Sequence, residues 1–143
     1  MHQVIVVGTD GSSTADAAVQ RAATLAKLTG ARVELVSGYR DNYAMAASVA
    51  LPVVDMTEDA RKAADGCLEQ AAARLRSDGV QVETHCMPGD AADALIDVAE
   101  ATEADLIVVG SKGMRGGRRF LLGNVPNKVS HHAPCSVMIV RTA

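Results

Sequence analysis

The sequence predicts an α/β fold: an open, doubly wound five-stranded parallel sheet with helices on both faces. Five short apolar runs alternate with segments whose apolar residues recur at helical spacing. Three of these runs are apolar at every position, as expected for strands covered on both faces. Strands that alternate with helices imply right-handed crossovers and parallel neighbours. We expect the strand order 3-2-1-4-5.

The first predicted strand, Val4–Val7, leads into a predicted helix over Ser12–Leu28. Alanine, valine and leucine recur through this helix every third or fourth residue, so one of its faces is apolar. Ser13 precedes Asp16 at the spacing of a capping pair, and Gly30 is a typical helix stop.

The second strand, Val33–Ser37, is followed by the least regular part of the chain. We expect a mobile loop over Arg40–Met56, with or without a short helix. A long helix over Thr57–Asp78 comes next, because alanine, leucine and one cysteine fall on one face and Gly79 ends the pattern. The third strand is predicted at Val80–Cys86.

A third helix is expected to begin at an Asp90 cap. The fourth strand, Leu106–Val109, leads into a glycine-rich stretch. A last helix covers about Gly123–His132 and ends before Pro134, which cannot continue it. The fifth strand is Val137–Val140.

Length and composition favour a single domain over residues 1–143. A net charge of −3 gives no support to a nucleic-acid partner, whose binding surface would be basic. No apolar run reaches the roughly 18 residues that a membrane span needs, and the start lacks the features of a signal peptide. Three widely spaced cysteines fit reduced thiols, so we expect a cytoplasmic protein without a membrane partner.

Two other functions of this fold class do not fit the residues. A phosphoacceptor receiver domain needs an acidic pair after strand one, an aspartate at the end of strand three and a lysine after strand five. This chain has a single Asp10, then Cys86, then Arg141 at those places. A flavin carrier would use aromatic side chains, of which the chain has two tyrosines and one phenylalanine.

Two loops leave strand ends with unusual chemistry. In such sheets, ligands bind beyond the carboxyl ends of the strands where the winding direction reverses. The predicted order makes strands one and four neighbours, so Gly8–Ser12 and the stretch after Val109 face one crevice. Five glycines lie within Gly110–Gly123, together with four cations: Lys112, Arg115, Arg118 and Arg119. Bare backbone amides, a helix start and positive charge together favour an anion.

Each of these patterns also has an alternative interpretation. The spacing Gly110-x2-Gly113-x9-Gly123-Asn124 is neither a Walker A loop nor a dinucleotide fingerprint, so spacing alone leaves open a basic surface loop without a ligand. Asp10 follows a buried strand, where an aspartate often caps the next helix; this role, contact with a ligand, or both stay open. A zinc site at the His131–His132 pair is disfavoured, because adjacent helical side chains point about 100° apart.

Three segments together resemble the universal stress protein family: Val6–Ser12, the glycine pattern of Gly110–Asn124, and the Val137–Val140 end. They cover nearly the whole chain in order. The resemblance implies an adenine-nucleotide alpha-hydrolase-like fold that binds ATP, AMP or cyclic AMP, with magnesium accompanying ATP. It also implies a homodimer joined at the Val137–Val140 strand, antiparallel across a twofold axis.

The resemblance to the ATP-binding branch of this family also implies the site residues. Gly110 and Gly113 flank ribose and phosphate there, Gly123–Val125 binds phosphate, and Thr9–Asp10 and the Gly38 backbone meet the base. The expected nucleotide-binding residues are Gly8, Thr9, Asp10, Gly38, Val109, Gly110, Gly113, Arg115, Gly123, Asn124 and Val125.

Two residues depart from the family pattern. Asn124 replaces the usual serine or threonine, although its amide can still donate a hydrogen bond. Pro126 stands where a hydroxyl residue is common, and so removes an O–H and an N–H donor. AMP and cyclic AMP therefore compete with ATP as the expected ligand.

The function that the sequence predicts is nucleotide binding in stress response or signalling. The alternative is a dimeric interaction module of the same fold that binds no nucleotide. No residue pattern supplies a general base beside the phosphates. Whether ATP is hydrolysed stays open, and any hydrolysis is expected to be slow.

Overall fold

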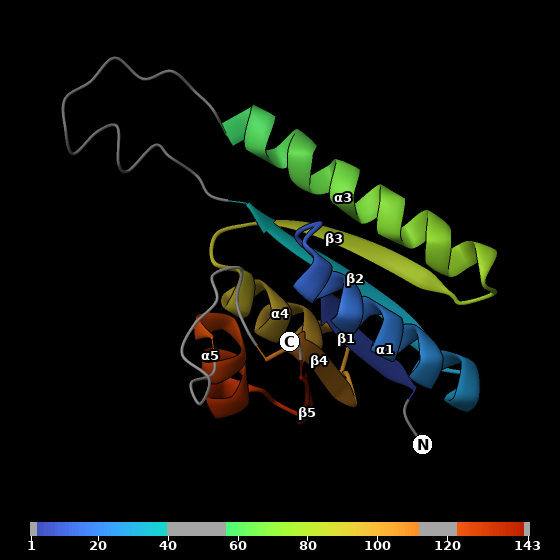
Figure 1. Cartoon of the computed structure of the whole chain (residues 1–143). Helices are drawn as coiled ribbons and strands as arrows, with labels where there is room; N and C mark the ends of the chain where they lie inside the picture. The colour runs from blue at the N-terminus through green and yellow to red at the C-terminus, as the bar shows by residue number, and fades with distance from the viewer. Residues whose placement is uncertain (1–2, 40–56, 112–122, 142–143) are drawn as a thin grey trace, which may run out of the picture.

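The computed structural model describes residues 3–39, 57–111 and 123–141, which form a five-stranded sheet between two layers of helices (Figure 1). The strands are β1 (Val4–Gly8), β2 (Arg32–Tyr39), β3 (Val82–Pro88), β4 (Leu106–Gly110) and β5 (Ser136–Val140). Their order is β3-β2-β1-β4-β5 and every pairing is parallel. The predicted fold class and strand order are confirmed.

The helices are α1 (Ser13–Thr29), α3 (Thr57–Ser77), α4 (Ala91–Ala101) and α5 (Asn124–His132). Helices α1 and α3 cover one face of the sheet, and α4 and α5 cover the other (Figure 1). Alternate residues of β1 supply both layers, because Ile5 and Val7 pack with α1 and α3 while Val6 packs with α4. The central strand is therefore apolar at successive positions.

The start of α1 differs from the expected capping pair of Ser13 and Asp16, which is wrong. Ser12 has an extended backbone (φ −76°, ψ 160°), and its Oγ accepts a hydrogen bond from Ala15 N at 3.2 Å. The helix therefore has its cap one residue earlier. Asp16 instead accepts a hydrogen bond from Arg74 Nη2 of α3 at 2.9 Å, which ties the two helices of this face together.

The other predicted helix ends are confirmed. Gly30 adopts a left-handed φ of 76° after α1, and Gly79 does the same at 86° after α3. Asp90 caps α4, since its Oδ2 accepts a hydrogen bond from Asp93 N at 3.3 Å. Helix α5 ends at His132, before Pro134.

Strand β3 begins two residues later than the predicted Val80–Cys86 and runs on to Pro88. Val80 N donates to Leu75 O at 3.0 Å, so this residue belongs to the turn that closes α3. Val80 is buried there, which explains why it extended the apolar run. The loop predicted over Arg40–Met56 lies outside the described residues. Within the described ranges, none of the helices has the length and apolarity needed to cross a membrane.

Candidate functional site

The carboxyl ends of β1 and β4 lie beside each other, as the predicted crevice requires. The two strands pair directly, with Val7 opposite Val108, and they end at Gly8 and Gly110. Val109, a residue of β4, is buried under the helix layer that contains α4 and α5. The loop after β1 and the start of the glycine-rich stretch therefore leave the same edge of the sheet.

The loop after β1 is held by hydrogen bonds of its own side chains. Thr9 is buried; its N donates to Val36 O at 2.9 Å, and its Oγ1 accepts from Gly11 N at 3.3 Å. Asp10 is exposed, and its Oδ1 accepts from Ser12 N at 2.8 Å. The cap interpretation of Asp10 is wrong, because Ser12 caps α1 and Asp10 orients Ser12.

Gly11 lies in the loop after β1. The sequence did not reveal why this position requires a glycine. Its φ is +82°, and a Cβ there would lie 3.0 Å from Cys67 Sγ of α3. Both the left-handed backbone and the contact with α3 therefore exclude a side chain at this position. A hydrophobic pattern places Cys67 on the inner face of its helix, but only the three-dimensional structure shows the loop that it supports.

Gly38 lies near the end of β2, and the turn that leads into α4 packs on it. A Cβ at Gly38 would lie 3.1 Å from Gly89 O and 3.2 Å from Ala91 Cα. Gly89 N also donates to Tyr39 O at 2.7 Å. Close approach of this turn explains the glycine, and contact of the Gly38 backbone with a base stays a prediction.

The two ends of the glycine-rich stretch meet. Ser111 N donates to Val140 O at 2.8 Å, and Gly123 N donates to Ser111 O at 3.1 Å. The chain thus returns to β4 and enters α5 beside the point where it left. Gly113 and Arg115, together with Lys112, Arg118 and Arg119, lie outside the described residues.

The start of α5 presents backbone amides. Gly123 is the N-cap with an extended backbone (φ −63°, ψ 169°), and no side chain caps the helix. The amides of Asn124 and Val125 belong to the first turn, where a helix has no acceptor for them, and Pro126 has no N–H. These amides and the helix dipole favour an anion at this edge of the sheet.

Lys128 joins α5 to the start of α4. Its Nζ lies 2.8 Å from Asp93 Oδ1 and 3.2 Å from Asp90 Oδ2. Hydrogen bonds to Asp93 and Asp90 raise the pKa of Lys128, and the charge on the ammonium is accordingly stabilised. Lys128 and Asp90 lie 38 positions apart along the chain, so no local pattern could have predicted this contact.

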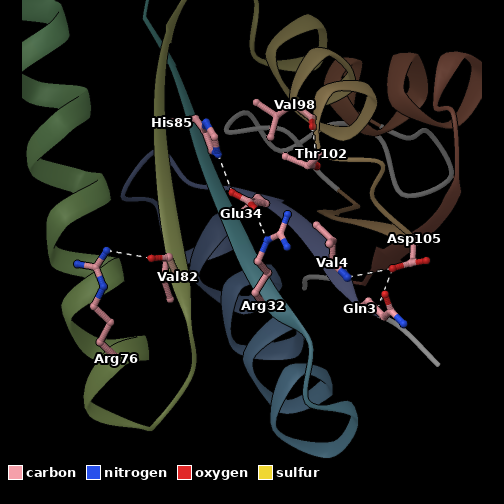
Figure 2. Close-up of polar contacts among 10 residues, drawn as sticks. All are labelled: Gln3, Val4, Arg32, Glu34, Arg76, Val82, His85, Val98, Thr102 and Asp105. Atoms are coloured by element: carbon pink, nitrogen blue, oxygen red, sulfur yellow. Dashed lines mark hydrogen bonds and ion pairs between the residues drawn. The ribbon is translucent and has the colours of Figure 1, made fainter.

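A second polar cluster lies on the α4 side of β2, toward the amino ends of the strands (Figure 2). Glu34 is 2% exposed and accepts hydrogen bonds from Arg32 Nε at 2.8 Å and from His85 Nε2 at 2.7 Å. The apolar run Val33–Ser37 predicted the strand but gave no role to its one charged residue. Nearby, Asp105 Oδ2 accepts from Val4 N at 2.9 Å, so side chains satisfy the backbone at this end.

The amino end also has a cavity of about 520 Å³, lined by residues that include Arg32, Arg76 and Glu83. Arg76 Nη2 donates to Val82 O at 3.0 Å (Figure 2). The cavity lies beside the starts of β2 and β3, at the opposite end from the two glycine loops. None of the predicted site residues lines it.

Metal and thiol chemistry have little support in the part of the chain that the structure describes. No group of three or more histidine, cysteine, aspartate or glutamate side chains there could hold a metal ion. Burial, and to a lesser degree Asp65, raises the pKa of the Cys86 thiol, and burial with Asp105 raises the pKa of Cys135. Both thiols therefore stay protonated and weakly nucleophilic at neutral pH.

Comparisons with known proteins agree with this geometry. The model of the universal stress protein family matches residues 1–141. Universal stress protein Rv1636 of Mycobacterium tuberculosis is 34% identical, covering 99% of this chain and 97% of the relative.

Two solved structures of universal stress proteins also match. One, in complex with cyclic AMP, is 29% identical with a TM-score of 0.76 and covers 99% of both chains. Another, from Archaeoglobus fulgidus in complex with dAMP, is 26% identical with a TM-score of 0.71 and covers 96% of both chains. The fold is adenine-nucleotide alpha-hydrolase-like, and the chain belongs to the universal stress protein family.

Proposed function

We propose that this protein binds an adenine nucleotide between the loop after β1 and the start of α5, in stress response or signalling. One observation carries the proposal: the loop that contains Thr9, the end of β4 at Gly110 and the N-terminus of α5 at Gly123 lie at one edge of the sheet. Relatives with the same fold were solved with cyclic AMP and with dAMP, which supports an adenine ligand.

In this proposal, the backbone supplies most contacts with the phosphate. Gly110 and Gly113 flank ribose and phosphate, and the amides at Gly123–Val125 bind phosphate oxygens. Arg115 adds positive potential. Because amides in a helix start are fixed while an exposed arginine is screened by solvent, the amides contribute more.

The base lies on the other side of the crevice in this proposal. Thr9 holds the loop against β2 through its hydrogen bond to Val36 O. Asp10 then accepts from the adenine amino group, and the backbone at Gly38 completes the base pocket. Gly8, at the end of β1, and Val109, one residue before the end of β4, form the floor.

We expect AMP or cyclic AMP to bind at least as tightly as ATP. Pro126 removes one amide from the first turn of α5, so fewer donors remain for a long triphosphate. Asp10 is the one carboxylate in the proposed set, and magnesium, which prefers several oxygen ligands, would be held mainly by the phosphates of ATP. Magnesium is therefore part of the proposal only together with ATP.

The proposed assembly is a homodimer through β5. This strand lies at the edge of the sheet, and its Ile139 side chain is 37% exposed, while Val137 and Met138 are half-buried. Apolar edge strands favour pairing with a second copy. Light scattering of Ile139→Pro, which removes a backbone donor, should give monomer or aggregate; an unchanged dimer would place the interface elsewhere.

The alternative function is a dimeric interaction module that binds no nucleotide. One experiment decides between the two functions. Calorimetric titration of protein stripped of bound ligand, with ATP, AMP and cyclic AMP in turn, separates the two. Saturable binding of any of these supports the proposal, and no heat with all three favours the module. We also propose that this single-domain protein is cytoplasmic, which its three unbridged cysteines support. We propose no nucleic-acid or membrane partner.

A further inference from the structure

We infer that the turn at the start of α4, Gly89–Asp93, positions the two halves of the proposed nucleotide site, and that Lys128 links this turn to the phosphate-binding helix. The inference rests on the proposed function, because it concerns the spacing between the base and phosphate parts of that site. Lys128 is thereby a positioning residue that acts through α5.

The first set of contacts joins the turn to the base side. Gly89 N donates to Tyr39 O at 2.7 Å, at the carboxyl end of β2. The bare Cα of Gly38 allows Gly89 O and Ala91 to pack so closely that a Cβ would lie 3.1 to 3.2 Å from them. The end of β2 and the turn therefore move together, because no space separates them.

The second set of contacts joins the same turn to the phosphate side. Lys128 Nζ pairs with Asp93 Oδ1 at 2.8 Å and with Asp90 Oδ2 at 3.2 Å. Asp90 Oδ2 also accepts from Asp93 N, so one carboxylate both caps α4 and holds Lys128. Lys128 lies three residues after Val125, whose amide belongs to the first turn of α5 and is proposed to bind phosphate.

Apolar packing alone does not fix how α5 sits along α4. The two helices lie side by side (Figure 1), and the fully buried Val129 holds them together. Apolar contacts are non-directional and tolerate sliding, whereas hydrogen bonds have narrow distance and angle ranges. The paired ammonium thus adds a directional restraint on the axial position of α5, beside the hydrogen bond from Gly123 N to Ser111 O, and so on the place of the Asn124 and Val125 amides.

A simpler possibility is that Lys128 attracts phosphate by its own positive charge. The two hypotheses make opposite predictions for Asp93→Asn. Removing this carboxylate makes the site more positive, so direct attraction predicts tighter binding of AMP. The positioning role predicts weaker binding, because Lys128 loses its shorter ion pair with α4 and keeps only the one with Asp90.

The test is calorimetric titration of AMP and adenosine into four proteins: the wild type, Lys128→Met, Asp93→Asn and Lys128→Arg. We expect Lys128→Met and Asp93→Asn to weaken AMP binding by about three- to fivefold, an effect in the range of exposed ion pairs. Adenosine, which lacks the phosphate, should bind all four alike. Lys128→Arg should restore most of the AMP affinity, since it keeps the charge and the donors.

Lys27→Met is the matched control. Lys27 Nζ pairs with Asp78 Oδ2 at 3.6 Å near the C-terminus of α1, so the change removes an exposed ion pair away from the site. AMP affinity should be unchanged in this variant. Unchanged or tighter AMP binding by Asp93→Asn would overturn the inference, as would an equal loss of adenosine binding.

A measurement without ligand separates this inference from the proposed function. Hydrogen exchange of backbone amides should be faster in α5 of Asp93→Asn than of the wild type, with β1 unchanged, because the polar link from α5 to α4 is weakened. If the wild type binds no adenine compound, the proposed function is wrong. The hydrogen exchange of α5 then still tests whether Lys128 positions this helix. Equal exchange of α5 in both proteins overturns this role.

Discussion

The two ends of the sheet satisfy their polar groups in different ways. At the amino end, side chains pair with one another and with the backbone: Glu34 holds Arg32 and His85, and Asp105 accepts from the amide of Val4. At the carboxyl end, side chains hold the loop after β1, but α5 starts at Gly123 without a side-chain cap. The difference teaches that side chains pair with the polar groups at one end, while at the other the amides of Asn124 and Val125 have no acceptor within their own helix.

The substitution with the largest expected effect at the carboxyl end is Gly123→Val. Valine can adopt the backbone of Gly123 (φ −63°, ψ 169°), so the fold should survive while its side chain obstructs the approach of phosphate. We expect AMP affinity to fall by at least about a hundredfold, or roughly 2.7 kcal/mol, in calorimetry. Circular dichroism checks the fold.

Gly113→Val should have the same effect, although Gly113 lies outside the described residues. If both glycine variants keep wild-type affinity, the nucleotide site is elsewhere and the interaction-module hypothesis takes over.

At the amino end, Arg32→Met should have the opposite effect: it should lower stability and leave AMP affinity unchanged. This change leaves the buried Glu34 carboxylate with His85 as its remaining partner in Figure 2, which should lower the free energy of unfolding by about 2 kcal/mol. AMP affinity should stay the same, because the cluster lies away from the glycine loops. Urea unfolding and calorimetry measure the two quantities.

Arg21→Met is a control for Arg32→Met, since it removes the same charge from an exposed position on α1. It should change stability by less than about 0.5 kcal/mol. A loss of AMP binding in Arg32→Met at preserved fold would show that the two ends are not independent.

A smaller effect is expected from Arg115→Ala. Arg115 lies outside the described residues; if it is an exposed cation near the phosphate, as proposed, water and salt screen it. Its removal should then weaken AMP binding by about tenfold or less, equal to about 1.4 kcal/mol. The loss should shrink as salt is raised, whereas the effect of Gly123→Val should not. A salt-independent loss larger than that of Gly123→Val would reverse the proposed ranking of side chain and backbone.

The smallest effect concerns the choice of base. If Asp10 accepts from the adenine amino group, Asp10→Ala should weaken AMP binding by about threefold more than GMP binding. Asp10 also orients Ser12 N, so Asp10→Asn, which keeps an oxygen acceptor there, serves as the comparison. Equal losses of AMP and GMP binding would limit Asp10 to holding the loop.

The fold was predictable because its strands carry an unambiguous pattern. The runs that became β1, β4 and β5 are apolar throughout, and Gly30 and Asp90 mark helix ends by local geometry. Such signals depend on a few neighbouring residues. The Ser12 cap shows their limit, because two adjacent serines offer the same chemistry and the loop before them decides which one is used.

The candidate site was predictable only in part. The neighbouring ends of β1 and β4 follow from strand order, which the alternation of strands and helices implies. The link between Lys128 and Asp93 and the burial of Glu34 depend on contacts between distant segments. No periodicity encodes them, since charged residues on a helix or in a strand are usually solvated.

The hydrogen bond from Gly123 N to Ser111 O has a consequence for how such a protein can evolve. The two ends of the intervening segment are already joined, so its length and content can change without moving β4 or α5. Loop closure is only weakly sensitive to length, at about 0.6 kcal/mol per doubling. If this segment contributes to the proposed site, ligand preference can diverge by its replacement, while the sheet and its β5 edge are inherited unchanged.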